Sequence, residues 1–147
     1  MWSVVVVGTD GSETAGTAVD QAAELAARAG ARLLVVSAFT PVGAGRLQAE
    51  AQQAPHDVEW MVHEREEVEA TLAEARERAA RHGLEAEVYA RRGDPADAIL
   101  DVAEEEGADL IVVGNKGMTG AKRFLLGSVP NRVSHHAPCS VLIIRTT

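Results

Sequence analysis

Short runs of consecutive apolar residues restrict the fold of this chain more than any other feature of its sequence. Four such runs are Val4–Val7, Leu33–Ala38, Leu110–Val113 and Ser140–Arg145. A strand with one solvated face alternates apolar and polar residues, whereas a strand buried on both faces is apolar throughout. We therefore expect these runs to be buried strands. A more polar run, Ala86–Arg91, is predicted to be a strand nearer the edge of the sheet.

Segments with apolar residues at helical spacing separate the expected strands. A glycine follows the first two of these segments, which is typical of a helix end. The segment from Thr40 to about Asp57 is rich in Gly, Pro, Ala and Gln, and is predicted to be a loop. The predicted helices are one ending at Gly30, one from about Trp60 to His82, one that begins with Asp94 as N-cap and Pro95 as first residue, and Ser128–His136.

The alternation of strands and helices predicts the fold class. Buried strands joined by helices form a parallel sheet that is covered on both faces. A length of 147 residues suits one domain. We therefore expect an α/β protein: a single doubly wound domain over residues 1–147, with a five-stranded parallel sheet flanked by helices.

Charge and cysteine content narrow the function classes. The net charge of −8 argues against nucleic-acid partners and anionic membranes, both of which attract cationic surfaces. No apolar stretch approaches the length of a membrane span, about 20 residues. The single cysteine, Cys139, excludes an intramolecular disulfide and is expected to be buried, which favours a reducing, cytoplasmic location.

Two turns carry the chemistry that a ligand site needs. In an open parallel sheet, ligands bind beyond the carboxyl ends of the strands, where the strand order reverses. Residues 8–12 follow the first expected strand, and residues 114–117 follow the fourth. If these two strands are neighbours, both turns open onto one crevice.

The second turn begins the strongest signal, the segment 114–128. Its glycines permit close backbone approach to a ligand, and it leads into a helix whose first N–H groups form an anion site. This pattern favours phosphate binding, although simple turns remain an alternative interpretation. The residues expected to contribute are Gly117, Gly127 and Ser128, with Lys116, Lys122 and Arg123 supplying positive charge.

The spacing Gly114-x2-Gly117-x9-Gly127-Ser128 resembles the nucleotide-binding signature of the universal stress protein family, in its ATP-binding branch. The resemblance covers essentially the whole chain, from residues 6–12 to residues 137–144. It implies a nucleotide-binding stress-response or regulatory protein. It also implies a homodimer joined through the last strand, Val141–Arg145.

The resemblance further implies which residues hold the nucleotide. Some ATP-binding relatives carry a hydroxyl residue where this chain has Pro130, so AMP and cyclic AMP are alternatives to ATP, and Mg²⁺ would accompany ATP. The implied contacts are Thr9 and Asp10 near the adenosine, Ala38 at the adenine, Val113 and Gly114 at the ribose, Lys116 and Gly117 near the phosphates, and backbone N–H groups of Gly127, Ser128 and Val129 on the phosphates.

Other interpretations remain open at this point. Asp10 is also typical of a helix cap or turn residue. No nucleophile–base set, P-loop or zinc spacing is evident, so we predict no catalytic residue and no metal ligand. A slow ATP hydrolase or phosphotransferase using the cationic residues of segment 114–128 is one alternative function. A nucleotide-free dimeric interaction module is another.

Overall fold

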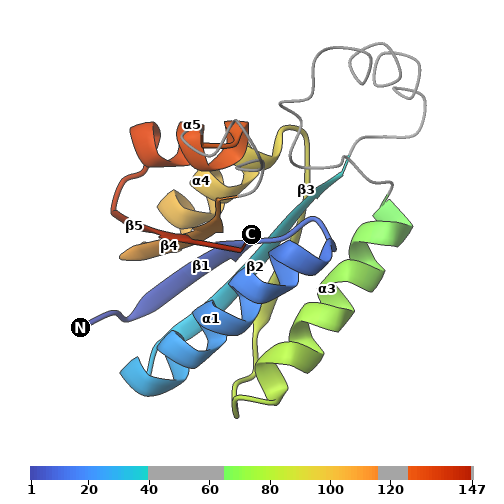
Figure 1. Ribbon diagram of the computed structural model, residues 1–147, viewed down its shortest axis with the longest axis vertical. Coiled ribbons are helices and arrows are strands. Elements are labelled where there is room, and N and C mark those ends of the chain that lie inside the picture. The colour runs from blue at the N-terminus through green and yellow to red at the C-terminus, as the bar shows by residue number, and fades with distance from the viewer. Residues whose placement is uncertain (40–64, 116–125, 147) are drawn as a thin grey trace.

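Strands and helices alternate along the chain in the computed structural model, which describes residues 1–39, 65–115 and 126–146 (Figure 1). This alternation confirms the predicted fold class. In chain order the elements are β1 (Val4–Gly8), α1 (Glu13–Ala29), β2 (Arg32–Phe39), α3 (Arg65–Ala80), β3 (Glu87–Arg92), α4 (Pro95–Glu105), β4 (Leu110–Gly114), α5 (Ser128–His136) and β5 (Ser140–Ile144).

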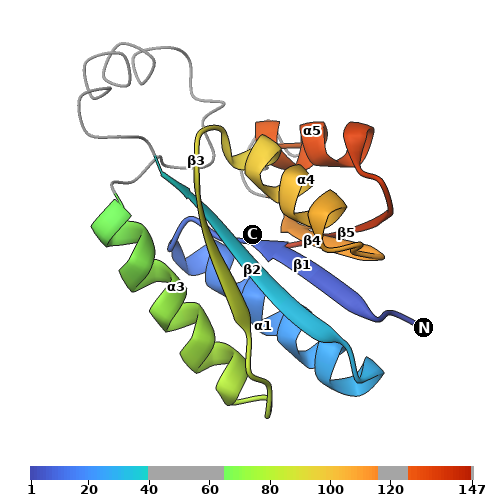
Figure 2. The same ribbon diagram turned by 180° about the vertical axis from the view of Figure 1, so that it is seen from behind.

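The five strands form one parallel sheet in the order β3-β2-β1-β4-β5. β1 is central, and Val6 lies in register with Leu34 of β2 and with Ile111 of β4. The polar strand β3 lies at one edge, as predicted, and β5 lies at the other. Figures 1 and 2 show α1 and α3 on one face of the sheet and α4 and α5 on the other, which is the doubly wound arrangement.

Two apolar cores, one on each face, explain the continuous apolar runs. Val5 and Val7 belong to the core under α1 and α3, whereas Val6 belongs to the core under α4 and α5. All three side chains are fully buried. Burying one such side chain contributes about 1.5–3 kcal/mol, so a strand with apolar residues at consecutive positions is stable only between two layers of helices.

The amino ends of α1 and α4 carry side-chain caps, formed by residue types that favour this position. The Ser12 side chain accepts a hydrogen bond from Ala15 N at 3.2 Å and caps α1. Asp94 accepts one from Asp97 N at 3.0 Å and caps α4, with Pro95 as the first helical residue, as predicted. The predicted loop at 40–57 and the first residues of the predicted helix at 60–82 lie outside the described residues.

A carboxylate joins β1 to β4 at the amino edge of the sheet. Asp109, just before β4, accepts hydrogen bonds from Ser3 N at 2.8 Å and from Val4 N at 3.0 Å. The backbone N–H of Val4, followed by that of Ser3, holds the pKa of Asp109 below its ordinary value despite partial desolvation. The ionised form of Asp109 is therefore favoured in the folded protein.

We expect Asp109→Asn to lower the free energy of unfolding by about 1–2 kcal/mol at pH 7, because hydrogen bonds to a charged acceptor are lost. A lowered folded-state pKa adds stability above the ordinary aspartate pKa of 3.8, and this stability is lost as pH falls through the folded value. Urea unfolding of both proteins between pH 7 and pH 3 measures the difference. A difference that stays constant down to pH 3 would contradict this role.

Candidate functional site

The strand order reverses between β1 and β4, and these two strands pair directly. From β1 the chain builds outward through β2 and β3 on one side, and through β4 and β5 on the other. The condition set by the sequence is therefore met: the turn after β1 and the segment after β4 leave the sheet at the same carboxyl edge. This is the position at which open α/β sheets bind ligands.

The turn after β1 is built from buried polar groups. Thr9 and Asp10 are each only 3% exposed. Thr9 N donates to the Val36 carbonyl of β2 at 2.9 Å. The Thr9 hydroxyl accepts a hydrogen bond from Gly11 N at 3.1 Å, and Asp10 Oδ1 accepts one from Ser12 N at 2.9 Å. Asp10 thus shapes the turn, while Ser12, and not Asp10, caps α1.

Gly11 fixes this turn against α3. Its φ of +82° is unfavourable for any residue with a side chain. A Cβ placed there would lie 2.7 Å from the Thr71 hydroxyl oxygen, well inside van der Waals contact. Both the conformation and the close approach therefore require glycine at this position.

The end of β4 is tied to the end of β5 by Asn115, which is 7% exposed. Asn115 N donates to the Ile144 carbonyl at 2.9 Å. Thr146 returns two hydrogen bonds to Asn115 Oδ1, from its backbone N at 2.8 Å and from its hydroxyl at 3.1 Å. The point at which the glycine-rich segment leaves the sheet is therefore held to the edge strand.

The first turn of α5 presents backbone donors at its amino end. Its N-cap is Gly127, and Asn131 N donates to the Gly127 carbonyl at 3.0 Å. The first N–H groups of a helix have no acceptor within it, and Pro130 has no N–H. Ser128 and Val129 therefore carry the backbone N–H groups of this first turn, at the end of the helix whose dipole favours an anion.

Two ion pairs join α5 to α4. Arg132 of α5 donates to Asp94 at 3.1 Å and to Asp97 at 2.8 Å. Both carboxylates belong to the amino end of α4, where Asp94 is the N-cap. All three side chains are near half exposure, so each pair contributes little stability in water. The packing of α5 on α4 depends instead on the buried residues Val129 and Val133 of α5, which belong to the core that α4 also lines.

The predicted site residues lie on both faces of the sheet at its carboxyl end. Ala38, Val113 and Val129 share the core under α4 and α5. Thr9 instead lines a cavity of about 10 Å³ between α1 and α3, which has room for one water at most. Gly114, Gly127 and Ser128 lie at the ends of their elements, while Lys116 and Gly117 lie outside the described residues.

Three further residues at this edge are not among the predicted ones: Ser37, Asn115 and Thr146. Ser37 is 1% exposed, and its hydroxyl is the only buried side-chain oxygen or nitrogen in the described residues without a hydrogen-bond partner. Ser37 could have been identified because it places a hydroxyl within an apolar strand. Asn115 could have been identified because it directly follows an apolar strand. For Thr146 the sequence contains no comparable signal.

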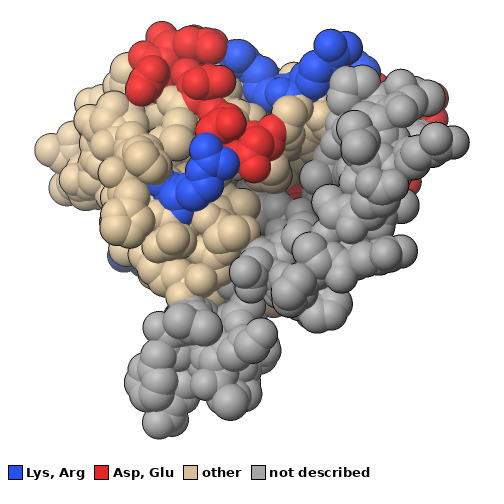
Figure 3. All heavy atoms as spheres, turned by 90° about the horizontal axis from the view of Figure 1, so that it is seen from above, with Lys and Arg blue, Asp and Glu red and all other residues tan. Residues whose placement is uncertain are grey.

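Figure 3 views the molecule from the side toward which β2 runs, and its described surface carries acidic and basic side chains together rather than one sign. Among the described residues, no group of three or more His, Cys, Asp or Glu side chains is arranged to hold a metal ion. Within the same part of the chain, no helix is both long and apolar enough to cross a membrane.

Comparison with known proteins places this geometry in one family. The model of the "Universal stress protein family" matches residues 1–145. Universal stress protein Rv1636 of Mycobacterium tuberculosis is 41% identical, over 99% of this chain and 98% of the relative. A universal stress protein crystallised in complex with cAMP is 36% identical, with a TM-score of 0.75 and coverage of 99% and 98%. The Archaeoglobus fulgidus protein in complex with dAMP is 28% identical, with a TM-score of 0.67 and coverage of 99% and 98%.

We expect Gly11→Ala to lower the free energy of unfolding by about 2 kcal/mol, combining the left-handed backbone with the contact to Thr71. In a Thr71→Ala background the nearest side-chain atom would be the Cβ at 3.6 Å, an ordinary contact. The same glycine change should then cost only about 1 kcal/mol. Urea unfolding of the four proteins in this double-mutant cycle measures the coupling. If Gly11→Ala lowered the free energy of unfolding equally in both backgrounds, the contact with the Thr71 side chain would not contribute to its cost.

Proposed function

Because the chain belongs to the universal stress protein family, we propose that it is a stress-response or regulatory protein that binds an adenine nucleotide, with ATP as the first candidate. The observation that carries this proposal is that the turn after β1 and the end of β4 lie at the same carboxyl edge of the sheet, between two directly paired strands. Two similar structures, crystallised with cAMP and dAMP, support an adenine nucleotide as the ligand.

The phosphate end of the ligand is proposed to lie at the amino end of α5. The backbone N–H groups of Ser128 and Val129 and the dipole of the helix favour an anion there, and Gly127 adds no side chain that would block it. Lys116 and Gly117 are proposed to approach the same phosphates. Pro130 removes one donor from this turn, which keeps AMP and cyclic AMP as alternatives to ATP, with Mg²⁺ accompanying only ATP.

The adenosine end is proposed to lie along the ends of β1, β2 and β4. Asp10 already accepts one hydrogen bond from the turn, and a carboxylate can accept several, so it can also bind a ribose hydroxyl. Both roles of Asp10 that the sequence left open are then compatible. Thr9, Ala38, Val113 and Gly114 are proposed to complete the contacts to the base and the sugar.

The edge strand β5 is proposed to join two copies of the chain through Val141–Arg145. In the part of the chain that the structure describes, β5 pairs with β4 on one side and with no strand on the other. Leu142 and Ile143 are 38% and 36% exposed, and they are among the four large apolar side chains that are exposed in the described residues. A homodimer would cover both the open strand edge and these side chains. We further propose that this dimer acts in the cytoplasm.

We expect the folded protein to bind ATP, AMP or cyclic AMP saturably in calorimetric titrations. We propose that the Ser128 hydroxyl adds a hydrogen bond to the phosphate beside the backbone N–H groups, so Ser128→Ala, which removes only the hydroxyl, should weaken binding about tenfold. Gly127→Val should abolish it, because its side chain would occupy the place of the phosphate. Ser134→Ala, at the far end of the same helix, is the matched control and should bind as the wild type does.

Circular dichroism and thermal melting check that each variant keeps its fold. Unchanged binding by folded Gly127→Val would overturn the proposed phosphate site. If the folded wild-type protein bound none of the three nucleotides, nucleotide binding itself would be excluded.

We expect Ile143→Glu to convert a dimer to a monomer in sedimentation velocity, because it places a charge in the proposed interface. Arg92→Glu introduces the same side chain on the opposite edge strand and should leave the dimer intact. A wild-type monomer, or a dimer that dissociates only in Arg92→Glu, would contradict the β5 interface.

A further inference from the structure

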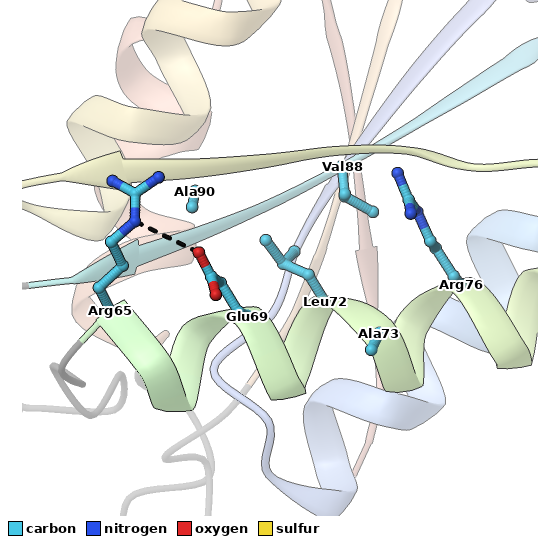
Figure 4. Close-up of a pocket in the computed structure, with 7 residues that line it drawn as sticks. All are labelled: Arg65, Glu69, Leu72, Ala73, Arg76, Val88 and Ala90. Carbon is cyan, nitrogen blue, oxygen red and sulfur yellow. Dashed lines mark hydrogen bonds and ion pairs between the residues drawn. The ribbon is translucent and has the colours of Figure 1, made fainter.

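A groove of about 370 Å³ lies between α3 and the edge strand β3, which β2 separates from β1 (Figure 4). Its floor is apolar, with Leu72 and Val88 pointing toward each other across it. Arg65 and Arg76 extend from α3 toward β3 at its two ends. The full lining is Arg65, Glu69, Leu72, Ala73, Arg76, Val88 and Ala90.

The backbone beside this groove is open to pairing. β3 pairs with β2 through residues 87–92, and no described strand lies on its other side. The outward N–H and C=O groups of an edge strand form a template for one more strand. Recognition of an extended peptide by strand addition uses such an edge for affinity and adjacent side-chain pockets for specificity.

The charges around the groove select an acidic occupant. Arg92 follows Val88 and Ala90 at the period-two spacing of β3, so it continues the face that lines the groove. Neither Arg76 nor Arg92 forms an ion pair with a described residue. In contrast, several other arginines outside the groove do: Arg28, Arg32, Arg78, Arg91 and Arg132.

Arg65 already contacts two other side chains of the protein. It donates to Glu69 at 3.3 Å, an exposed pair that contributes little, and its guanidinium lies 5.4 Å from the centre of the Phe39 ring. This contact places the guanidinium of Arg65 near the carboxyl end of β3, since Phe39 is in register with Arg92. An incoming carboxylate can therefore replace Glu69 without moving Arg65 away from the groove.

The spacing of the two groove arginines defines the pattern that fits. Arg65 and Arg76 are about three helical turns, or about 16 Å, apart along α3. Alternate residues of an added strand face the groove, and two acidic residues four positions apart are separated by about 13 Å. The flexible arginine side chains span the remainder, and the residue midway between the acidic pair lies over Leu72 and Val88.

We propose that this groove binds an extended segment of a partner protein with the pattern acidic–x–apolar–x–acidic, added to β3 as a sixth strand. Its carboxylates pair with Arg65 and Arg76, and its central apolar side chain covers Leu72 and Val88. Arg92 adds positive charge at the carboxyl end of β3. This interaction uses neither the nucleotide site nor β5.

The test is a fluorescence anisotropy titration of the full chain with a labelled peptide, Thr-Glu-Thr-Val-Thr-Glu-Thr. We expect saturable binding that weakens with added salt, and none with the peptide that carries Lys in place of Glu. Arg76→Glu should weaken binding at least about tenfold. Arg81→Glu makes the same charge change beyond the end of α3, outside the groove, and should not alter binding.

A second pair of peptides tests strand addition. Every second amide is N-methylated in each peptide, and the two peptides carry the methyl groups at alternate positions. Each peptide therefore lacks the N–H groups along one edge of its extended backbone. Binding should be lost for one of the two peptides. Equal binding of both methylated peptides, equal binding of the Lys peptide, or unchanged affinity in folded Arg76→Glu would overturn the proposal. No saturable binding below about 1 mM would do so as well, and would leave these arginines as residues that protect the sheet edge.

Discussion

The parallel pairing of β1 with β4 is the contact on which the candidate site depends. It joins two strands that are more than a hundred residues apart in sequence, and it makes β1 the centre of the sheet. Apolar side chains on both faces of β1 leave it no stable position except between two helical layers. The carboxyl ends of both strands then meet at one edge, which is the position at which open α/β sheets bind ligands.

Tertiary contacts fix the turns and helix ends at this edge more firmly than local preference could. Gly11 is packed against Thr71 of α3, Asn115 is held by Thr146 after β5, and Arg132 joins α5 to α4. Each contact joins residues that are far apart in the sequence. The turn after β1 is therefore preformed by the fold, since its hydrogen bonds do not depend on a ligand.

Much of the fold could be predicted because its signals are local. Consecutive apolar residues identify buried strands such as Val4–Gly8, and Asp94 with Pro95 marks the start of α4. The Ser12 cap of α1 is also a local contact, made with Ala15, that serine at this position favours. The partner of Gly11 and the bond from Thr146 to Asn115, by contrast, depend on residues brought together only by folding. Sequence spacing alone cannot predict such pairs, although it correctly selected the strand ends on which they act.

The most direct test of a nucleotide at this edge is an NMR titration of the ¹⁵N-labelled protein with ATP, AMP and cyclic AMP. We expect saturable shifts of the backbone amides of Thr9, Asp10, Gly127, Ser128 and Val129, with the amides of β3 and α3 beside the peptide groove unchanged. Saturable shifts confined to other parts of the chain, with these five amides unmoved, would contradict this placement of the nucleotide.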